Sequence, residues 1–312
     1  MTKDNTKRRA DLDMLFVCLA LSVSGVFIGG SAALFQLASC AVFCLLCEYL
    51  AFKVFLKGKC FSFSEAICDG VLIALLLSAH SPVYVGLCAV AFCVFVCKMP
   101  FGGKKYAPFS PVAGGICFVY ALFKNECFKY FTENYSLLFG ASKSFSKASS
   151  LLSMLKNGDS ISLNVFDTSS VLCGNFPSAI GTASVLTLVG VSLFLLIRQK
   201  EKLFCFLPFV VTSALFAAIF PRVNSGAICS IIMELSAGSL IFSGILLFCD
   251  SDRIPKSRLS SALYGAAFGI LSMALRFVSP ATDSTPFCVL IMNSIYPVFS
   301  KGITKKRGAV NV

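Results

Sequence analysis

The feature that most constrains this chain is a succession of apolar runs, each close to the length that crosses a lipid bilayer. A transmembrane helix requires about 20 consecutive, mainly apolar residues. Ten such runs can be read, at 12–30, 33–56, 64–80, 82–98, 110–123, 178–197, 203–220, 228–249, 259–278 and 284–300. The run at 110–123 is short, which favours a broken or re-entrant helix. The succession predicts an all-α integral membrane protein with about ten transmembrane helices.

Composition agrees with lipid as the solvent. The 312 residues are 57% hydrophobic and only 13% charged, whereas soluble domains carry about 25% charged residues. The single His argues against His-based metal sites and His acid–base catalysis, so no metal site is predicted. The net charge of +12 is spread over short clusters between apolar runs, which indicates membrane topology rather than nucleic-acid binding.

The positions of Lys and Arg predict the orientation in the membrane. The cationic clusters lie near 3–9, 53–59, 98–105, 198–202, 253–258 and 301–307. These clusters share one side of the membrane if the N-terminus is cytoplasmic, as the positive-inside rule requires. We therefore predict a multi-pass protein of the bacterial inner membrane, with both termini in the cytoplasm.

The chain divides into three parts: a five-helix membrane repeat at 1–123, an extracytoplasmic loop at 124–177 and a second five-helix repeat at 178–312. An odd number of helices in each half predicts two inverted repeats, an arrangement common among transporters. Pro111 and Pro297 lie in the last apolar run of each half. They are expected to interrupt those helices.

Charged residues within apolar runs are costly and are therefore candidates for an ion pathway. Asp69 and Glu234 lie deep in the third and eighth runs, at roughly corresponding positions of the two halves. Glu48 lies near the cytoplasmic end of the second run, where it either reaches the interface or joins the same pathway. Arg276 ends the ninth run and is expected to pair with Asp283.

Three stretches place small, polar and helix-breaking residues within apolar sequence. They run from Phe101 to Gly115, from Gly174 to Leu196, and from Leu275 to Pro297. In order and spacing they match the motifs FGG…PFNPAxxG, GxxPGxxGETSxLAxLxGGxxLL and LIRxxGGxPEGxxFAVLLMNxxxP. On these motifs the chain resembles, over about residues 12–300, the family of the D subunit of the Rnf-type electron transport complex, which is related to the B subunit of the sodium-pumping NADH:quinone oxidoreductase.

The resemblance implies two flavins. One is an FMN joined by a phosphoester to a hydroxyl of the outer loop, which falls on Ser149, or on Ser150 in an alternative register. A serine-rich loop without flavin is the other interpretation, because neighbouring family residues are replaced. A second, non-covalent flavin would be lined by Ser110, Pro111, Gly181, Thr182, Ser184 and Asn293. The family's GETS is here Gly181-Thr182-Ala183-Ser184, so a carboxylate is lost.

The function implied by the resemblance is that of a translocase subunit, inactive alone, in a ferredoxin/NAD oxidoreductase complex that couples electron transfer to cation transport. Its partners would be the other membrane and peripheral subunits and the lipid bilayer, with no nucleic acid. The coupling ion, sodium or proton, is left open. Two alternatives are a channel or transporter for a small solute and a non-redox scaffold subunit on the same fold.

Overall fold

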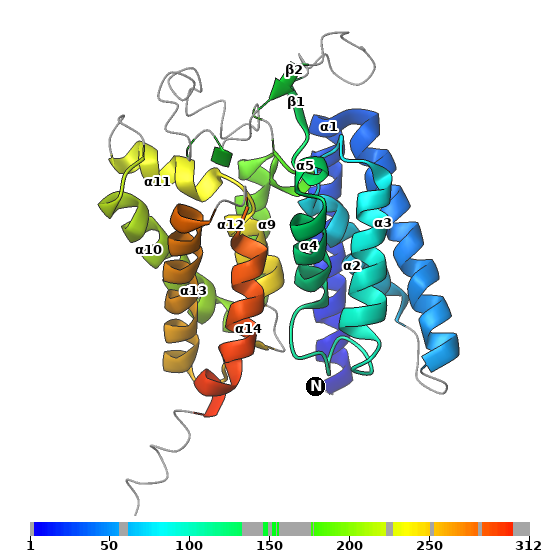
Figure 1. Cartoon of the computed structure of the whole chain (residues 1–312). Helices are drawn as coiled ribbons and strands as arrows, with labels where there is room; N and C mark the ends of the chain where they lie inside the picture. Colours follow the sequence, from blue (N-terminus) through cyan, green and yellow to red (C-terminus); the bar gives the residue numbers. More distant parts are fainter. Residues whose placement is uncertain are drawn as a thin grey trace, which may run out of the picture.

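The protein is a helical bundle with one pair of very short strands, described here from a computed structural model (Figure 1). The structure describes residues 3–55, 62–132, 146–148, 152–153, 155, 176, 178–222, 227–249, 253–279 and 283–301. The elements of the N-terminal half are α1 (Lys3–Phe55), α2 (Phe63–Leu76), α3 (Val83–Phe92), the π-helix η1 (Cys93–Lys98), α4 (Pro111–Leu122) and α5 (Lys124–Cys127). Strands β1 (Tyr130–Thr132) and β2 (Ser146–Ala148) pair antiparallel. There follow the 3-10 turn η2 (Ile180–Thr182), α9 (Val185–Arg198), α10 (Lys200–Ile219), α11 (Ala227–Ser236), α12 (Leu240–Phe242), the π-helix η3 (Ser243–Phe248), α13 (Arg258–Val278) and α14 (Thr285–Lys301).

Each of the ten apolar runs falls on a helical segment, so the predicted all-α class is confirmed. The first two runs form the two arms of α1, which is kinked where Gly30 leaves helical geometry (φ 63°, ψ −151°). The run at 228–249 is bent by 65° between α11 and the following α12–η3 segment. The run at 178–197 becomes helical only at Val185, after an N-cap at Ser184.

Among the described residues, three helical stretches are long and apolar enough to cross a membrane: Arg9–Val54, which holds both arms of α1, then Lys200–Ile219 and Arg258–Val278. The bent α11–α12–η3 pair adds a fourth if it is taken as one span. The other apolar helices, including α4 and α14, have 10–17 residues. The protein is thus a membrane protein, while ten spans and inverted repeats stay predictions.

The outward faces of the helices carry large apolar side chains. Leu186 and Ile197 of α9 are each 72% exposed, and Val278 of α13 is 83% exposed. Similar exposed side chains lie along α1 and α10. Soluble proteins rarely leave so much apolar surface uncovered, so these faces are suited to lipid.

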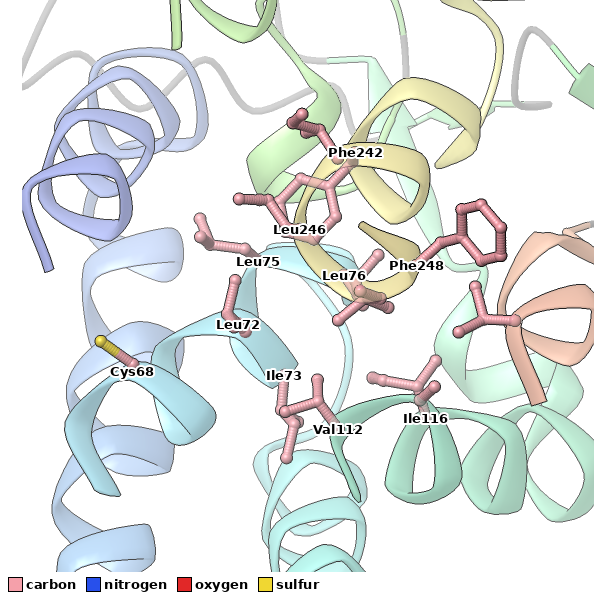
Figure 2. Packing of buried hydrophobic residues seen from close by; sticks show 14 of the residues in the cluster. Cys68, Leu72, Ile73, Leu75, Leu76, Val112, Ile116, Phe242, Leu246 and Phe248 are labelled. Carbon is pink, nitrogen blue, oxygen red and sulfur yellow. The ribbon is translucent and has the colours of Figure 1, made fainter. Parts of the chain in front are cut away.

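The centre of the bundle is packed by apolar side chains from both halves of the chain. Leu72, Leu75 and Leu76 of α2 lie close to Phe242 and Leu246 of the α12–η3 segment (Figure 2). The close approach of helices uses small residues, as in many membrane bundles. A Cβ on Gly70 would lie 2.8 Å from the Cys40 carbonyl oxygen, so α2 packs directly on the second arm of α1.

The two prolines do not interrupt their helices. Pro111 is the first residue of α4, a position where its missing N–H removes no helical hydrogen bond. Pro297 lies inside α14, which continues to Lys301. The expectation of broken helices at these prolines is therefore wrong. The start of α1 and the end of α14 lie at one end of the bundle, and β1 and β2 at the other (Figure 1).

Candidate functional site

Four charged residues of the N-terminal half form a buried network, which we call the lysine cluster: Glu48, Asp69, Lys98 and Lys104. The Lys98 ammonium lies 2.5 Å from Glu48 Oε1 and 2.7 Å from Asp69 Oδ2. Lys104 Nζ lies 3.6 Å from the other oxygen of Asp69. Glu48, Asp69 and Lys98 are at most 1% exposed as residues. Such burial is tolerated only because each charge has an opposite partner.

The elements that bring these charges together are distant in sequence. Glu48 comes from the second arm of α1, Asp69 from the middle of α2, and Lys98 ends the π-helix η1. A π-helix is uncommon and is frequently found at functional sites. Lys104 belongs to the segment that connects η1 to α4. Glu48 is buried and bonded to Lys98 rather than placed at an exposed interface, while its part in an ion pathway stays a prediction.

Lys98, which the sequence placed in a cytoplasmic cationic cluster, has a buried side chain. Its side chain is 2% exposed and points to two carboxylates. The same holds in part for Lys202 and Arg253, which were also assigned to such clusters and are buried. One signal was available: Lys98 follows the apolar sequence from Cys93 to Cys97 with no polar spacer.

A second group, the arginine cluster, comprises Arg222, Glu234, Arg276 and Asp283 of the C-terminal half. Arg276 donates hydrogen bonds to the backbone carbonyls of Glu234 (2.8 Å) and Ala237 (2.6 Å). Its Nη1 lies 3.7 Å from the Glu234 carboxylate, and Arg222 Nε lies 3.5 Å from the same carboxylate. Both oxygens of this fully buried carboxylate lack a hydrogen-bond partner.

Asp283 binds backbone rather than Arg276. Its two carboxylate oxygens accept hydrogen bonds from the amides of Ser239 (2.9 Å) and Thr285 (3.1 Å). The ion-pair partner of Arg276 is Glu234, so the expected pair with Asp283 is corrected. Arg222 follows α10 outside its helical span, where burial lowers the pKa of its guanidinium despite the nearby carboxylate.

The residues expected around a non-covalent flavin are only partly suited to a ligand. The Thr182 hydroxyl donates to the Ala179 carbonyl (3.2 Å), and the Ser184 hydroxyl accepts from the Thr187 amide as the N-cap of α9. A Cβ on Gly181 would lie 2.8 Å from Leu75 and Phe242, so this glycine serves close packing. The Thr182 and Ser184 hydroxyls thus each make a local backbone hydrogen bond, and a flavin at these three positions stays a prediction.

Asn293 behaves differently. It lies on α14 and is 2% exposed, and neither its side-chain nitrogen nor its oxygen has a hydrogen-bond partner. An unpaired buried amide costs free energy, which a polar ligand would recover. Ser110 and Pro111 are buried at the start of α4, which packs against α14. The α4–α14 contact thus fits a bound polar group better than the η2 region.

Ser149 and Ser150 lie outside the described residues, so the covalent flavin site stays a prediction. The neighbouring strand β2, Ser146–Ala148, pairs with β1 just after α5.

Sequence reasoning missed a contact between the two halves. Arg253, in the segment before α13, donates to the carbonyl oxygens of Lys104 (3.2 Å), Ala107 (3.4 Å) and Phe109 (3.2 Å). It thereby holds the segment that carries Lys104 and leads into Ser110. No sequence pattern pairs an arginine with backbone carbonyls so far away in the chain.

The fold and the two buried clusters define a polytopic membrane protein with compensated charges inside an apolar bundle. A family model described as the NQR2, RnfD, RnfE family matches residues 1–308. The chain belongs to this family, as the sequence motifs predicted.

Two curated relatives are similar at low identity. The B subunit of the Na(+)-translocating NADH-quinone reductase of Chromohalobacter salexigens is 23% identical over 233 residues, which cover 73% of this chain and 55% of that protein. The D subunit of the ion-translocating oxidoreductase complex of Ectopseudomonas mendocina is 24% identical over 302 residues, covering 91% of this chain and 87% of the relative. The chain thus spans little more than half the length of the first relative.

Proposed function

We propose that this chain is a membrane subunit of an ion-translocating oxidoreductase complex and contributes part of its cation pathway. Family membership and the names of the two relatives support this function. The observation that carries it is the lysine cluster. Burying two carboxylates and an ammonium in an apolar bundle costs free energy, so such groups usually mark a functional site.

The proposed pathway uses Glu48 and Asp69 in one half of the chain and Glu234 in the other. The carboxylates of Asp69 and Glu234 are fully buried, and one oxygen of Asp69 and both oxygens of Glu234 lack a hydrogen-bond partner. Such an oxygen is able to accept a proton or to join the oxygen ligands of a hard cation.

Electron transfer in the proposed complex involves FMN attached at Ser149 and a second flavin near Asn293. When bound, the flavin supplies the redox chemistry by accepting and releasing electrons. The chain's own contribution is position and hydrogen bonding, for which Asn293 and Ser110 are the candidates. The other membrane and peripheral subunits are its partners, in the bacterial inner membrane with both termini in the cytoplasm.

The ion pathway is tested with Asp69→Asn in the reconstituted complex. Removing the charge should lower cation transport per electron transferred at least tenfold, because Lys98 and Lys104 then leave an excess positive charge that repels cations. The matched control is Glu201→Gln, which neutralises an exposed acid in the first turn of α10. Normal transport by Asp69→Asn would remove this residue from the pathway.

The flavin proposal is tested by fluorescence of the denatured chain in a gel after co-expression with a flavin transferase. Only covalently bound flavin survives denaturation. Ser149→Ala should abolish the fluorescent band and Ser150→Ala should retain it; the reverse result would shift the anchor by one residue. A dark wild-type band with an active transferase would contradict a covalent flavin and favour the channel or scaffold alternative.

A further inference from the structure

We propose that the carboxylates of Glu48 and Asp69 form a monovalent-cation site that the Lys98 ammonium occupies as a tethered cation. Lys98 would then determine which ions enter this part of the pathway. The inference rests on the proposed role of Glu48 and Asp69, and it adds a specificity-determining residue to it.

The geometry around Lys98 is that of a bound cation. Its ammonium contacts one oxygen from each of two carboxylates, at 2.5 and 2.7 Å, and these come from different helices. Both acids are at most 1% exposed. An ammonium and an alkali cation carry the same charge, and both favour carboxylate oxygens. The two therefore compete for one position.

An unused ligand lies beside this position. Asp69 Oδ1 is buried without a hydrogen-bond partner, and Lys104 Nζ, 3.6 Å away, is too distant to bond it. The Lys98 contacts thus leave part of the coordinating capacity of Asp69 unsatisfied. An alkali cation, which favours several oxygen ligands, would use it.

The charge balance explains why Lys98 excludes a second cation. The lysine cluster pairs two carboxylates with two ammonium groups, so its formal charge is zero. Adding an alkali ion would leave a buried net positive charge, which is costly in a medium of low dielectric constant. A cation can enter only when Lys98 withdraws.

Lysine is suited to such withdrawal because its ammonium sits on a flexible stem of four carbons. Lys104 is 23% exposed at its side chain, whereas Asp69 beside it is fully buried. Lys104 therefore lies on the more exposed side of the lysine cluster.

The inference is tested by thermal unfolding of the purified full chain in NaCl and in choline chloride at equal ionic strength. The wild type should show no Na⁺-specific shift. Lys98→Ala should gain a saturable upward shift of about 5 °C at a hundredfold excess over Kd, because Na⁺ binds only the folded state. Methylammonium chloride should give a similar shift.

Two control variants separate this result from a general salt effect. Lys98→Arg keeps a tethered cation and should show no Na⁺ response. Lys98→Ala combined with Asp69→Asn removes a carboxylate and should lose the response. A Na⁺ shift of equal size in the wild type, or none in Lys98→Ala, would overturn the inference.

If Lys98→Ala yields little folded protein, the readout becomes its recovery during purification. Methylammonium or Na⁺ should restore the yield and tetramethylammonium should not, because it is too large for the vacated position; equal yields in all three would contradict the inference. Failure of the proposed function is seen separately. A complex that moves no ions, with a Lys98→Ala chain that binds Na⁺, would retain the cation site and reject the pathway.

Discussion

The lysine cluster and the arginine cluster bury similar charges in opposite ways. In the lysine cluster, side chains bond side chains, since the ammonium contacts two carboxylates at 2.5 and 2.7 Å. In the arginine cluster, the guanidinium of Arg276 bonds two backbone carbonyls at 2.8 and 2.6 Å and meets the Glu234 carboxylate only at 3.7 Å. A guanidinium that is hydrogen-bonded to backbone carbonyls stabilises the fold, whereas an ammonium held between two carboxylates can be replaced by another cation.

This difference between the two clusters corresponds to a difference in the backbone next to them. Arg276 spans the break between α11 and α12, where Gly238 has a φ of 65°. A Cβ at Gly238 would lie 3.2 Å from Arg276 Nη2 and 3.4 Å from Asp283 Oδ2. The arginine and the aspartate therefore serve as caps for a bend. In the lysine cluster, α2 is continuous across Asp69, and the positive-φ residues Gly102 and Gly103 lie in the turn after η1.

The largest expected effect comes from breaking the arginine cluster. Arg276→Met removes two carbonyl hydrogen bonds and leaves the buried Glu234 carboxylate with Arg222 alone, which should cost about 3–5 kcal/mol of stability. Thermal unfolding of the purified chain in detergent measures it. The control is Arg198→Met, because that half-exposed arginine pairs with Asp13 at 2.9 Å and its loss should leave the stability nearly unchanged. Equal losses would refute a structural role for Arg276.

A double-mutant cycle sharpens the comparison. The coupling energy between Lys98→Met and Asp69→Asn should be about 2–3 kcal/mol, since the pair is buried and hydrogen-bonded at 2.7 Å. The coupling between Arg276→Met and Glu234→Gln should be about 1 kcal/mol, because these charges are 3.7 Å apart. Unfolding free energies of the single and double variants give both values. A larger coupling energy in the arginine cluster than in the lysine cluster would contradict the view that Arg276 acts mainly on the backbone and Lys98 mainly on carboxylates.

The smallest expected effect concerns the link between the two halves. Arg253→Gln removes the contacts that hold Lys104, Ala107 and Phe109, and should cost about 1–2 kcal/mol. It should also reduce the effect of Asp69→Asn, because Lys104 is then less well placed. Arg258→Gln is the control, since this exposed arginine stacks over the Phe204 ring at 4.9 Å. A stability change no larger than that of the control would contradict the link.

The sequence predicted the helices well because apolar length is a local property. It also found Glu48, Asp69 and Glu234, since acids within apolar runs are conspicuous. It did not reveal that Lys98 is buried, because a cation at the end of a run looks the same whether it reaches outward to solvent or back to buried acids. Which of these occurs depends on how the helices pack, and helix packing cannot be predicted from the apolar run alone.

The flavin residues illustrate a different limit. The motif at Gly181–Ser184 is predicted to line a cofactor, and in the structure its small and polar residues also cap α9 and allow close packing with Leu75. Capping, packing and ligand binding favour the same residue types. Asn293 stands apart because its buried amide has no partner, a property that requires coordinates to detect.

The kink at Gly30 has a consequence for how the chain is made. With φ 63° and ψ −151°, this residue adopts a backbone conformation that is essentially restricted to glycine, although no side chain or backbone from elsewhere in the fold lies within 4 Å of where a Cβ would stand. The two arms of α1 are therefore joined by one residue, with no loop between them. Such a hairpin is completed before any later helix is synthesised, so the first step of membrane insertion would insert both arms together. The second arm would then be present when α2, which carries Asp69, packs against it.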